Sequence, residues 1–183
     1  YLFIGLMLGT LPVVFRQANK KGFRAIYIVP CIISLSITII TVILENSGID
    51  IIPDTAPGML QLALYGAIIG LGTIVPGISA SFVLMYLGAY KIVLDGLANI
   101  NLSILVPVGT GFVISIILFA KFISFLFKKA YGFTYYTVIG FVIGSIIAIF
   151  PGISFSSEYL ISILLFIIGY FISFSLSKHS KDV

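Results

Sequence analysis

The fold of this chain is decided by the stretch Thr73-Ile74-Val75-Pro76-Gly77-Ile78-Ser79-Ala80-Ser81, which interrupts an apolar segment over residues 58–94. A helix cannot pass through Pro76 without losing a backbone hydrogen bond, and Gly77 permits backbone angles that other residues avoid. One membrane crossing takes about 20 residues, so the segment is too long for a single crossing. We therefore predict a re-entrant helical hairpin over residues 58–94 that is broken at Pro76 and Gly77.

The composition places the whole chain in a lipid bilayer. Hydrophobic residues make up 60% of the 183 residues and charged residues only 9%. Soluble domains carry about 25% charged residues, and a water-soluble fold of this size cannot bury so much apolar side chain. We expect an all-α, polytopic membrane helix bundle that forms a single transmembrane domain over residues 1–183.

Other apolar stretches have the length of a membrane span, about 20 residues for about 30 Å of hydrocarbon. They cover residues 25–44, 104–127, 134–150 and 159–176. Residues 1–15 are apolar but too short to span alone, so we expect the end of a helix that starts before Tyr1. On this interpretation residues 1–44 are the end of a first half and a linker, and residues 58–176 are the second half.

The charges predict the direction of each span. Four basic residues lie within 16–24, two more are Lys128 and Lys129, and the tail carries Lys178 and Lys181. Cytoplasmic loops are enriched in basic residues, and all these clusters share one side only if the hairpin returns to the side that it entered. A single crossing by residues 58–94 would place Lys128 and Lys129 outside. We therefore expect the hairpin to enter from the outside, with two arms of about 25 Å each.

A short motif occurs twice. Residues 4–10 and 139–145 both read Ile-Gly-x-x-x-Gly followed by Thr or Ser. Small residues four apart are common at contacts between membrane helices, and Gly66 and Gly70 share the spacing, so the motif can be a packing feature alone. The predicted directions of the two copies are opposite, however, which is typical of the inverted repeats of transporters. On that interpretation a sister hairpin would precede Tyr1.

The hairpin break carries the candidate site. The arm that follows Gly77 starts with free backbone N–H groups, and two serine hydroxyls lie beside them. Such donors favour a phosphate or carboxylate, whereas the alternative is a kink whose serines bond back to the helix. The predicted phosphate ligands are Gly77, Ile78, Ser79, Ala80, Ser81 and Lys121.

Lys121 lies inside a predicted span and allows two interpretations. Its side chain can extend to the cytoplasmic interface near Lys128, or it can face the bundle and pair with a lipid phosphate. Lys91 and Asp95, four residues apart, are expected to form an ion pair.

The remaining composition argues against several classes of site. Cys31 is the only cysteine and His179 the only histidine, so we expect no disulfide, no metal site and no cofactor. The basic residues form short clusters between spans rather than one patch, so we expect no nucleic-acid partner. The sequence does not indicate an oligomeric state.

The stretch from Gly70 to Phe82, with Tyr86-Leu87-Gly88-Ala89-Tyr90, Lys121-Phe122-Ile123-Ser124 and the repeat at residues 139–145, resembles the PopT-type polyprenyl-phosphate transporters. The likeness covers nearly the whole chain as the C-terminal part of a two-half protein. It implies a multi-pass protein of the bacterial plasma membrane that returns undecaprenyl phosphate, or a related carrier lipid, from the outer to the inner leaflet. The family more often has glycine at Ala80, which leaves a glycine-dependent backbone contact there in question.

Other functions fit parts of the pattern. Undecaprenyl-pyrophosphate phosphatases of the bacitracin-resistance type carry a similar Pro-Gly-x-Ser-Arg-Ser turn, but Ala80 replaces the arginine here. Phosphoryl transfer needs charge stabilisation and an activated nucleophile, and Glu45, Glu158 and the aspartates are expected in loops or tails. We therefore expect no enzyme activity. A transporter of a small anion and a purely structural membrane subunit are the further alternatives.

Overall fold

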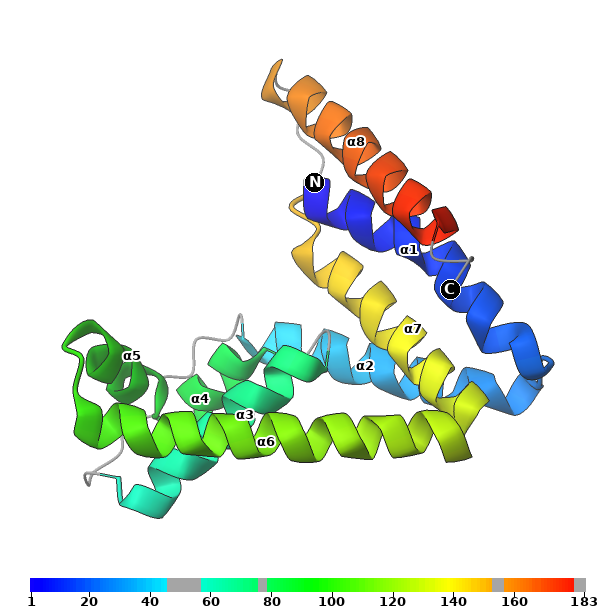
Figure 1. Ribbon diagram of the computed structural model, residues 1–183. Coiled ribbons are helices and arrows are strands. Elements are labelled where there is room, and N and C mark those ends of the chain that lie inside the picture. The colour runs from blue at the N-terminus through cyan, green and yellow to red at the C-terminus, as the bar shows by residue number, and fades with distance from the viewer. Residues whose placement is uncertain (46–56, 76–78, 153–156, 180–183) are drawn as a thin grey trace. The chain divides into compact units, whose positions relative to one another are not determined.

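The computed structural model describes residues 1–45, 57–75, 79–152 and 157–179, all of them helices, turns or short connections without a strand. Pro76, Gly77 and Ile78, where we predict the hairpin break, lie outside the described residues. The helices are α1 (Leu2–Ala18), α2 (Ile28–Glu45), α3 (Met59–Ile74), α4 (Ala80–Tyr86), α5 (Tyr90–Ala98), α6 (Leu102–Lys129), α7 (Tyr131–Ile149) and α8 (Ser157–His179). The expected all-α membrane bundle is confirmed (Figure 1).

Within the described residues, four helical segments are long and apolar enough to cross a membrane: Leu2–Lys21, Ala25–Glu45, Leu102–Lys129 and Tyr131–Ile149. The expectation that the first apolar stretch is too short was wrong, because α1 continues through Ala18 into a 3₁₀ turn, Asn19–Lys21. Many large apolar side chains on these helices are exposed, among them Ile32, Ile114 and Leu118. An exposed surface of this kind requires lipid around it.

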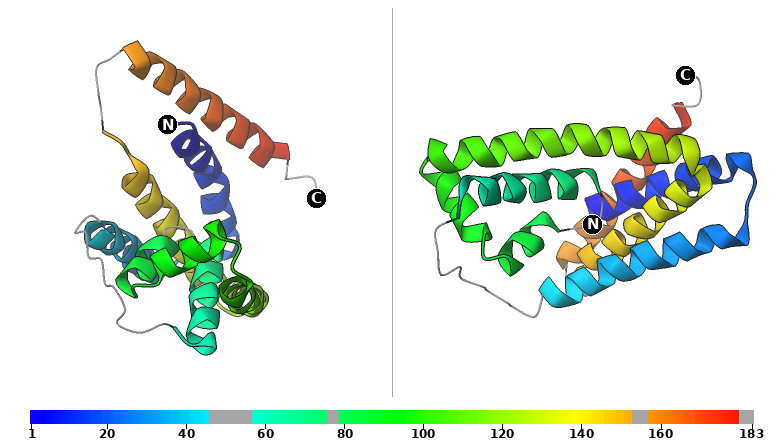
Figure 2. Two further views of the ribbon diagram at one scale, coloured as in Figure 1. Left: turned by 90° about the vertical axis from the view of Figure 1, so that its left-hand side faces the viewer. Right: turned by 90° about the horizontal axis from the view of Figure 1, so that it is seen from below.

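The chain forms two compact units, and the first comprises Ile40–Lys129. Within it α3 and α6 pack along their lengths (Figures 1 and 2). Gly66 lies against the Val108 carbonyl, and Gly70 lies against Phe112 and Ser115. Residue numbers rise together on both helices, so α3 and α6 are parallel. Parallel helices require the chain to return to its starting side between them, which agrees with the predicted hairpin.

The returning arm is not the single helix that we expected. It consists of α4 and α5, which meet at an angle of 112°. At the bend the Gly88 N–H donates to the Met85 carbonyl and the Ala89 N–H to the Leu84 carbonyl, and Gly88 has φ +67°. This pair of hydrogen bonds around a left-handed residue is a Schellman motif, which ends a helix.

The end of α5 repeats this motif with an unusual residue. The Ile100 N–H donates to the Leu97 carbonyl, and the Asn101 N–H donates to the Gly96 carbonyl. Ile100 therefore takes the left-handed position, with φ +50°, where a β-branched side chain is strained. Its side chain is exposed and makes no packing contribution that would offset the strain.

The second unit comprises Tyr1–Ile39 with Ala130–Val183. Its helices also form parallel pairs at small residues. On α1, Gly5 lies against the Phe166 carbonyl and Gly9 lies against Ser173 of α8. On α7, Gly140 lies against the Cys31 carbonyl and Gly144 lies against Thr38 of α2. The small residues let the helix backbones approach closely, as is common in membranes.

One sequence offset relates these two pairs. Gly5 and Gly140 are 135 positions apart, and so are their contact partners Cys31 and Phe166. The same offset relates the Gly9–Ser173 contact to the Gly144–Thr38 contact. The pair α1–α8 is thus repeated as α7–α2.

The helices that carry the two motifs run in opposite directions. The Tyr1 ring packs edge-on against Phe150 at one end, and Tyr136 donates to the Asn19 side chain at the other. α1 and α7 are therefore antiparallel, as an inverted repeat requires. The motif is both a packing feature and a repeat.

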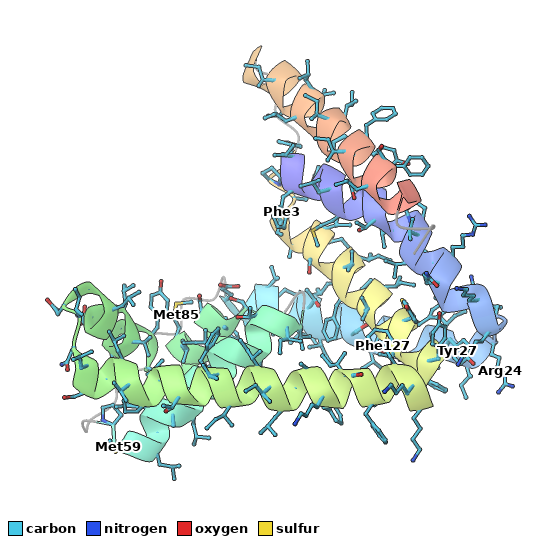
Figure 3. The ribbon with its side chains drawn as sticks, viewed as in Figure 1. Phe3, Arg24, Tyr27, Met59, Met85 and Phe127 are labelled. Carbon is cyan, nitrogen blue, oxygen red and sulfur yellow. The ribbon has the colours of Figure 1, made fainter. Side chains whose placement is uncertain are left out.

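An aromatic cluster closes one end of this unit. Tyr136 and Ile139 are buried with Ala18, and the Tyr27 ring lies 5.8 Å from that of Tyr136. Figure 3 shows Tyr27 and Arg24 at the turn between α1 and α2. Arg24 is exposed there, as expected for a charge at a membrane interface.

Candidate functional site

The described part of the hairpin end lies between α3 and α4. The last hydrogen bond of α3 is donated by the Val75 N–H to the Leu71 carbonyl, and α4 begins at Ala80. Of the predicted phosphate ligands, Ser79, Ala80, Ser81 and Lys121 are described. Gly77 and Ile78 lie outside the described residues.

The Ser79 hydroxyl makes two hydrogen bonds. It is the N-cap of α4 and accepts from the Phe82 N–H at 3.2 Å. It also donates to Oε1 of Glu45 at 3.1 Å, and both side chains are half-buried. The hydrogen bond from the Phe82 N–H is the bond to the serine's own helix that the kink interpretation predicts. That interpretation does not predict the second hydrogen bond, to Glu45.

Sequence reasoning missed Glu45, which we expected in a loop. It is instead the last residue of α2, in hydrogen-bonding contact with the hairpin serine 34 positions later in the chain. The signal in the sequence was that Glu45 directly follows an apolar span, where a carboxylate is costly unless it has a hydrogen-bonding partner. The partner itself could not be read from that position.

At Ala80 the two arms approach each other closely. A Cβ added to Gly72 of α3 would lie 2.7 Å from the Ala80 Cβ, which is far inside normal contact distance. The hairpin thus has a methyl group on α4 and no side chain at the facing position of α3. Because Gly72 has no side chain, the two backbones can come close here even though residue 80 is alanine and not glycine.

Ser81 and Lys121 are both exposed. Since α3 and α6 are parallel and Gly70 lies beside Ser115, the end of α3 is level with residues 116–119 of α6. Lys121 follows within one turn. Among the described contacts none joins Lys121 to the serines, so its two interpretations both remain predictions.

Lys91 and Asp95 do not form the expected ion pair. Both are exposed on α5, and the described contacts include no bridge between them. The Asp95 backbone carbonyl instead accepts from the Asn99 side chain at 2.9 Å. In water-exposed positions such a pair contributes little, so its absence has little effect on the helix.

The second unit holds an open apolar groove of about 320 Å³ between α1 and α8. Its lining is aliphatic and aromatic apart from two hydroxyl residues, and comprises Phe3, Leu6, Met7, Thr10, Ser173 and Leu176. Phe3 is labelled near the N-terminal end of α1 in Figure 3. Within the described residues no group of three potential metal ligands occurs.

Comparison with known proteins relates these features to a family. A family model described as VCA0040-like, undecaprenyl phosphate translocase-like, matches residues 1–177. A polyprenyl-phosphate transporter of Staphylococcus aureus is 29% identical over 194 residues, which cover 100% of this chain and 68% of that protein. A polyprenyl-phosphate transporter of Vibrio cholerae is 33% identical over 95 residues, or 52% of this chain and 31% of that protein. No solved structure matches significantly. Since the family model covers nearly the whole chain, this chain belongs to the VCA0040-like, undecaprenyl phosphate translocase-like family.

Proposed function

We propose that this chain is part of a transporter that carries undecaprenyl phosphate, or a related polyprenyl phosphate, across the bacterial plasma membrane. The observation that carries the proposal is a polar hairpin end in an otherwise apolar bundle, in a chain that belongs to a translocase-like family. The basic clusters at residues 16–24 and 128–129 favour a hairpin that enters from the outside. That direction suits return of the lipid from the outer to the inner leaflet.

The chemistry of the hairpin end fits a phosphate. A phosphate that leaves water needs hydrogen-bond donors, because an unpaired charge in hydrocarbon is very costly. The described donors are the hydroxyls of Ser79 and Ser81, and the proposed site also includes the backbone of Gly77, Ile78 and Ala80. α4 has only seven residues, so these individual donors matter more than its helix dipole.

The polyprenyl tail needs no enclosed cavity. The spans expose large apolar side chains to the surrounding lipid. A long isoprenoid chain can remain in that lipid while only its phosphate enters the protein. A site that opens sideways to the bilayer is therefore sufficient.

Hydrolysis is the second candidate function, and one observation favours it. Glu45 brings a carboxylate to a serine at the turn, as an enzyme that activates a nucleophile would need. Against it, Ala80 occupies the position of the arginine in the phosphatase turn, and the described contacts of Ser79 are with Glu45 and Phe82 rather than with a cation that would stabilise the developing charge. We propose transport without hydrolysis.

Two measurements test the proposal. Depletion of the protein in cells is expected to increase undecaprenyl phosphate on the outer surface of the plasma membrane. An unchanged distribution, together with altered uptake of a soluble anion, would contradict lipid transport. Purified full-length protein is expected to release no inorganic phosphate from polyprenyl pyrophosphate, and release above a protein-free control would establish the enzyme instead.

A further inference from the structure

We propose that the turn between α1 and α2 binds the phosphate head group of an anionic phospholipid in the cytoplasmic leaflet. Its basic residues are all exposed, and they are Arg16, Lys20, Lys21 and Arg24. The turn belongs to the second unit, whereas the described residues of the proposed transport site belong to the first. The two sites therefore share no described residue, and the lipid site does not depend on the proposed function.

The described part of the second unit offers these four positive charges no acidic neighbour. Residues 1–39 and 130–152 contain no aspartate or glutamate, and Glu158 lies at the start of α8. Since α1 and α8 are parallel with Gly9 beside Ser173, Glu158 lies towards the other end of this helix pair. An anionic lipid can supply the negative charge, and basic clusters next to a membrane span commonly recognise one.

Contacts with α7 hold this turn in one geometry. The Lys21 ammonium lies over the Tyr131 ring, 4.7 Å from its centre, and the Tyr131 hydroxyl donates to the Gln17 carbonyl at 2.8 Å. The Tyr136 hydroxyl donates to the Asn19 side chain at 3.0 Å. A ring attracts the charge of an ammonium group without accepting all of its N–H groups. Lys21 is therefore held in place while it can still donate to a phosphate.

Apolar side chains beside the charges favour a lipid over a soluble anion. Phe23 and Ile26 lie on either side of Arg24 in the sequence, and each is 57% exposed. The Phe23 ring also lies 6.1 Å from that of Tyr136, so this part of the turn lies against α7. Figure 3 shows Arg24 and Tyr27 at the same turn. A phospholipid brings acyl chains to the apolar side chains and a phosphate to the basic ones.

Diffuse attraction between charges is the alternative explanation. Cytoplasmic loops are enriched in basic residues whether or not they bind a particular lipid. Diffuse attraction depends on how many charges there are, whereas a binding site also depends on where each charge is held. The Tyr131 ring separates the two explanations, because it positions Lys21 and carries no charge itself.

The test uses the full-length protein in detergent micelles, and native mass spectrometry measures the binding of added lipid. The probes are phosphatidylglycerol and phosphatidylcholine with the same acyl chains. Lys21→Gln removes one charge from the turn, and Tyr131→Leu removes the ring but no charge. Lys91→Gln is the matched control, since Lys91 is also exposed but lies on α5 in the first unit. Thermal unfolding checks that each variant is folded.

We expect the wild type to bind phosphatidylglycerol on the order of tenfold more tightly than phosphatidylcholine. Lys21→Gln should weaken the binding of phosphatidylglycerol about fivefold, which is the effect of one charge at a membrane surface. Tyr131→Leu should weaken it about twofold or more, because the ammonium group is no longer held. Lys91→Gln should bind both lipids as the wild type does.

Three results would show that no such site exists. The first is equal affinity of the wild type for the two phospholipids. The second is an equal loss of phosphatidylglycerol binding in Lys21→Gln and Lys91→Gln. The third is a Tyr131→Leu variant that binds phosphatidylglycerol as tightly as the wild type, since diffuse attraction alone would give that result.

Two further ligands test whether the partner is a phospholipid. Glycerol phosphate has the phosphate but no acyl chains, and it is expected to bind far more weakly than phosphatidylglycerol. Equal binding would assign the turn to a soluble anion instead. Farnesyl phosphate, a short polyprenyl phosphate, represents the transported lipid. If it binds more tightly than phosphatidylglycerol and Lys21→Gln removes that difference, the turn is a site for the transported lipid and the proposal is wrong.

Discussion

At the scale of single residues, Ser79 links two distant parts of the chain. Its hydroxyl caps α4 through Phe82 and holds the carboxylate of Glu45. Beside it, Gly72 leaves room for the Ala80 methyl group. If Ser79 only capped a kink, its replacement would change stability alone. If it also lies in a binding site, its replacement would change the affinity for the lipid phosphate as well.

Replacing Ser79 by alanine is expected to weaken binding of farnesyl phosphate by about tenfold, because one charge-assisted hydrogen bond is lost. The helix cap is lost as well, at a cost of about 1 kcal/mol. Calorimetric titration measures the binding, and membrane fractionation checks insertion. Unchanged affinity in a correctly inserted variant would show that the turn is only a kink.

Replacing Ile100 by glycine is expected to stabilise the protein by about 1 kcal/mol. Its left-handed φ of +50° suits glycine, and its exposed side chain loses no buried contact. Thermal unfolding in detergent measures the change. Leu97→Gly is the matched control, since Leu97 is also exposed but lies inside α5, and it should destabilise. A lower melting temperature for Ile100→Gly would contradict the strain argument.

At the scale of elements, the parallel contact between α3 and α6 positions the hairpin end. Its small residues allow backbone to meet backbone, and the Ser115 hydroxyl donates to the Ala67 carbonyl across the contact at 2.8 Å. Within a membrane such contacts rely on close packing, because lipid is as apolar as the side chains. The position of α4 and Ser79 therefore depends on this helix pair.

Replacing Gly66 by alanine is expected to destabilise the protein by about 2 kcal/mol or more, because the new methyl group would overlap the Val108 carbonyl. Gly109→Ala is the matched control, since a Cβ at Gly109 would meet no atom within 4 Å. Alanine is also the better helix former, so that variant should be neutral or slightly stabilising. Equal melting temperatures for the two variants would disprove the α3–α6 register.

At the scale of the whole molecule, the repeat gives a stronger test than any single contact. The pairs α1–α8 and α7–α2 use glycines that are 135 positions apart, and of these Gly5 and Gly140 lie against backbone carbonyls. These glycines and the residues that they contact all lie within the same compact unit. An inverted repeat implies that equivalent positions carry equivalent packing constraints.

Gly5→Ala and Gly140→Ala are therefore expected to destabilise the protein to a similar extent, by about 2 kcal/mol each. The added methyl group would overlap the Phe166 carbonyl in one case and the Cys31 carbonyl in the other. Chemical or thermal unfolding in detergent compares the two variants. If one variant is tolerated and the other prevents folding, the two helix pairs are not structurally equivalent.

Local properties of the sequence already determined the class of protein and most of its helices. The excess of apolar residues requires lipid, and the placement of the basic residues favours a hairpin that returns to the side from which it entered. These inferences succeed because each depends on composition, on chain length or on neighbouring residues. The structure agrees with them in the parallel packing of α3 and α6.

Only the tertiary structure decided the contacts between distant residues. The bend at Gly88 was missed because a Schellman motif is defined by backbone hydrogen bonds, and a single glycine in the sequence does not predict them. Glu45 looked like a loop acid, and only folding brought it to Ser79, 34 positions away. Apolar patterning shows which segments enter the membrane, but packing between helices decides which polar groups meet there, and here that packing places an acid at the proposed phosphate site.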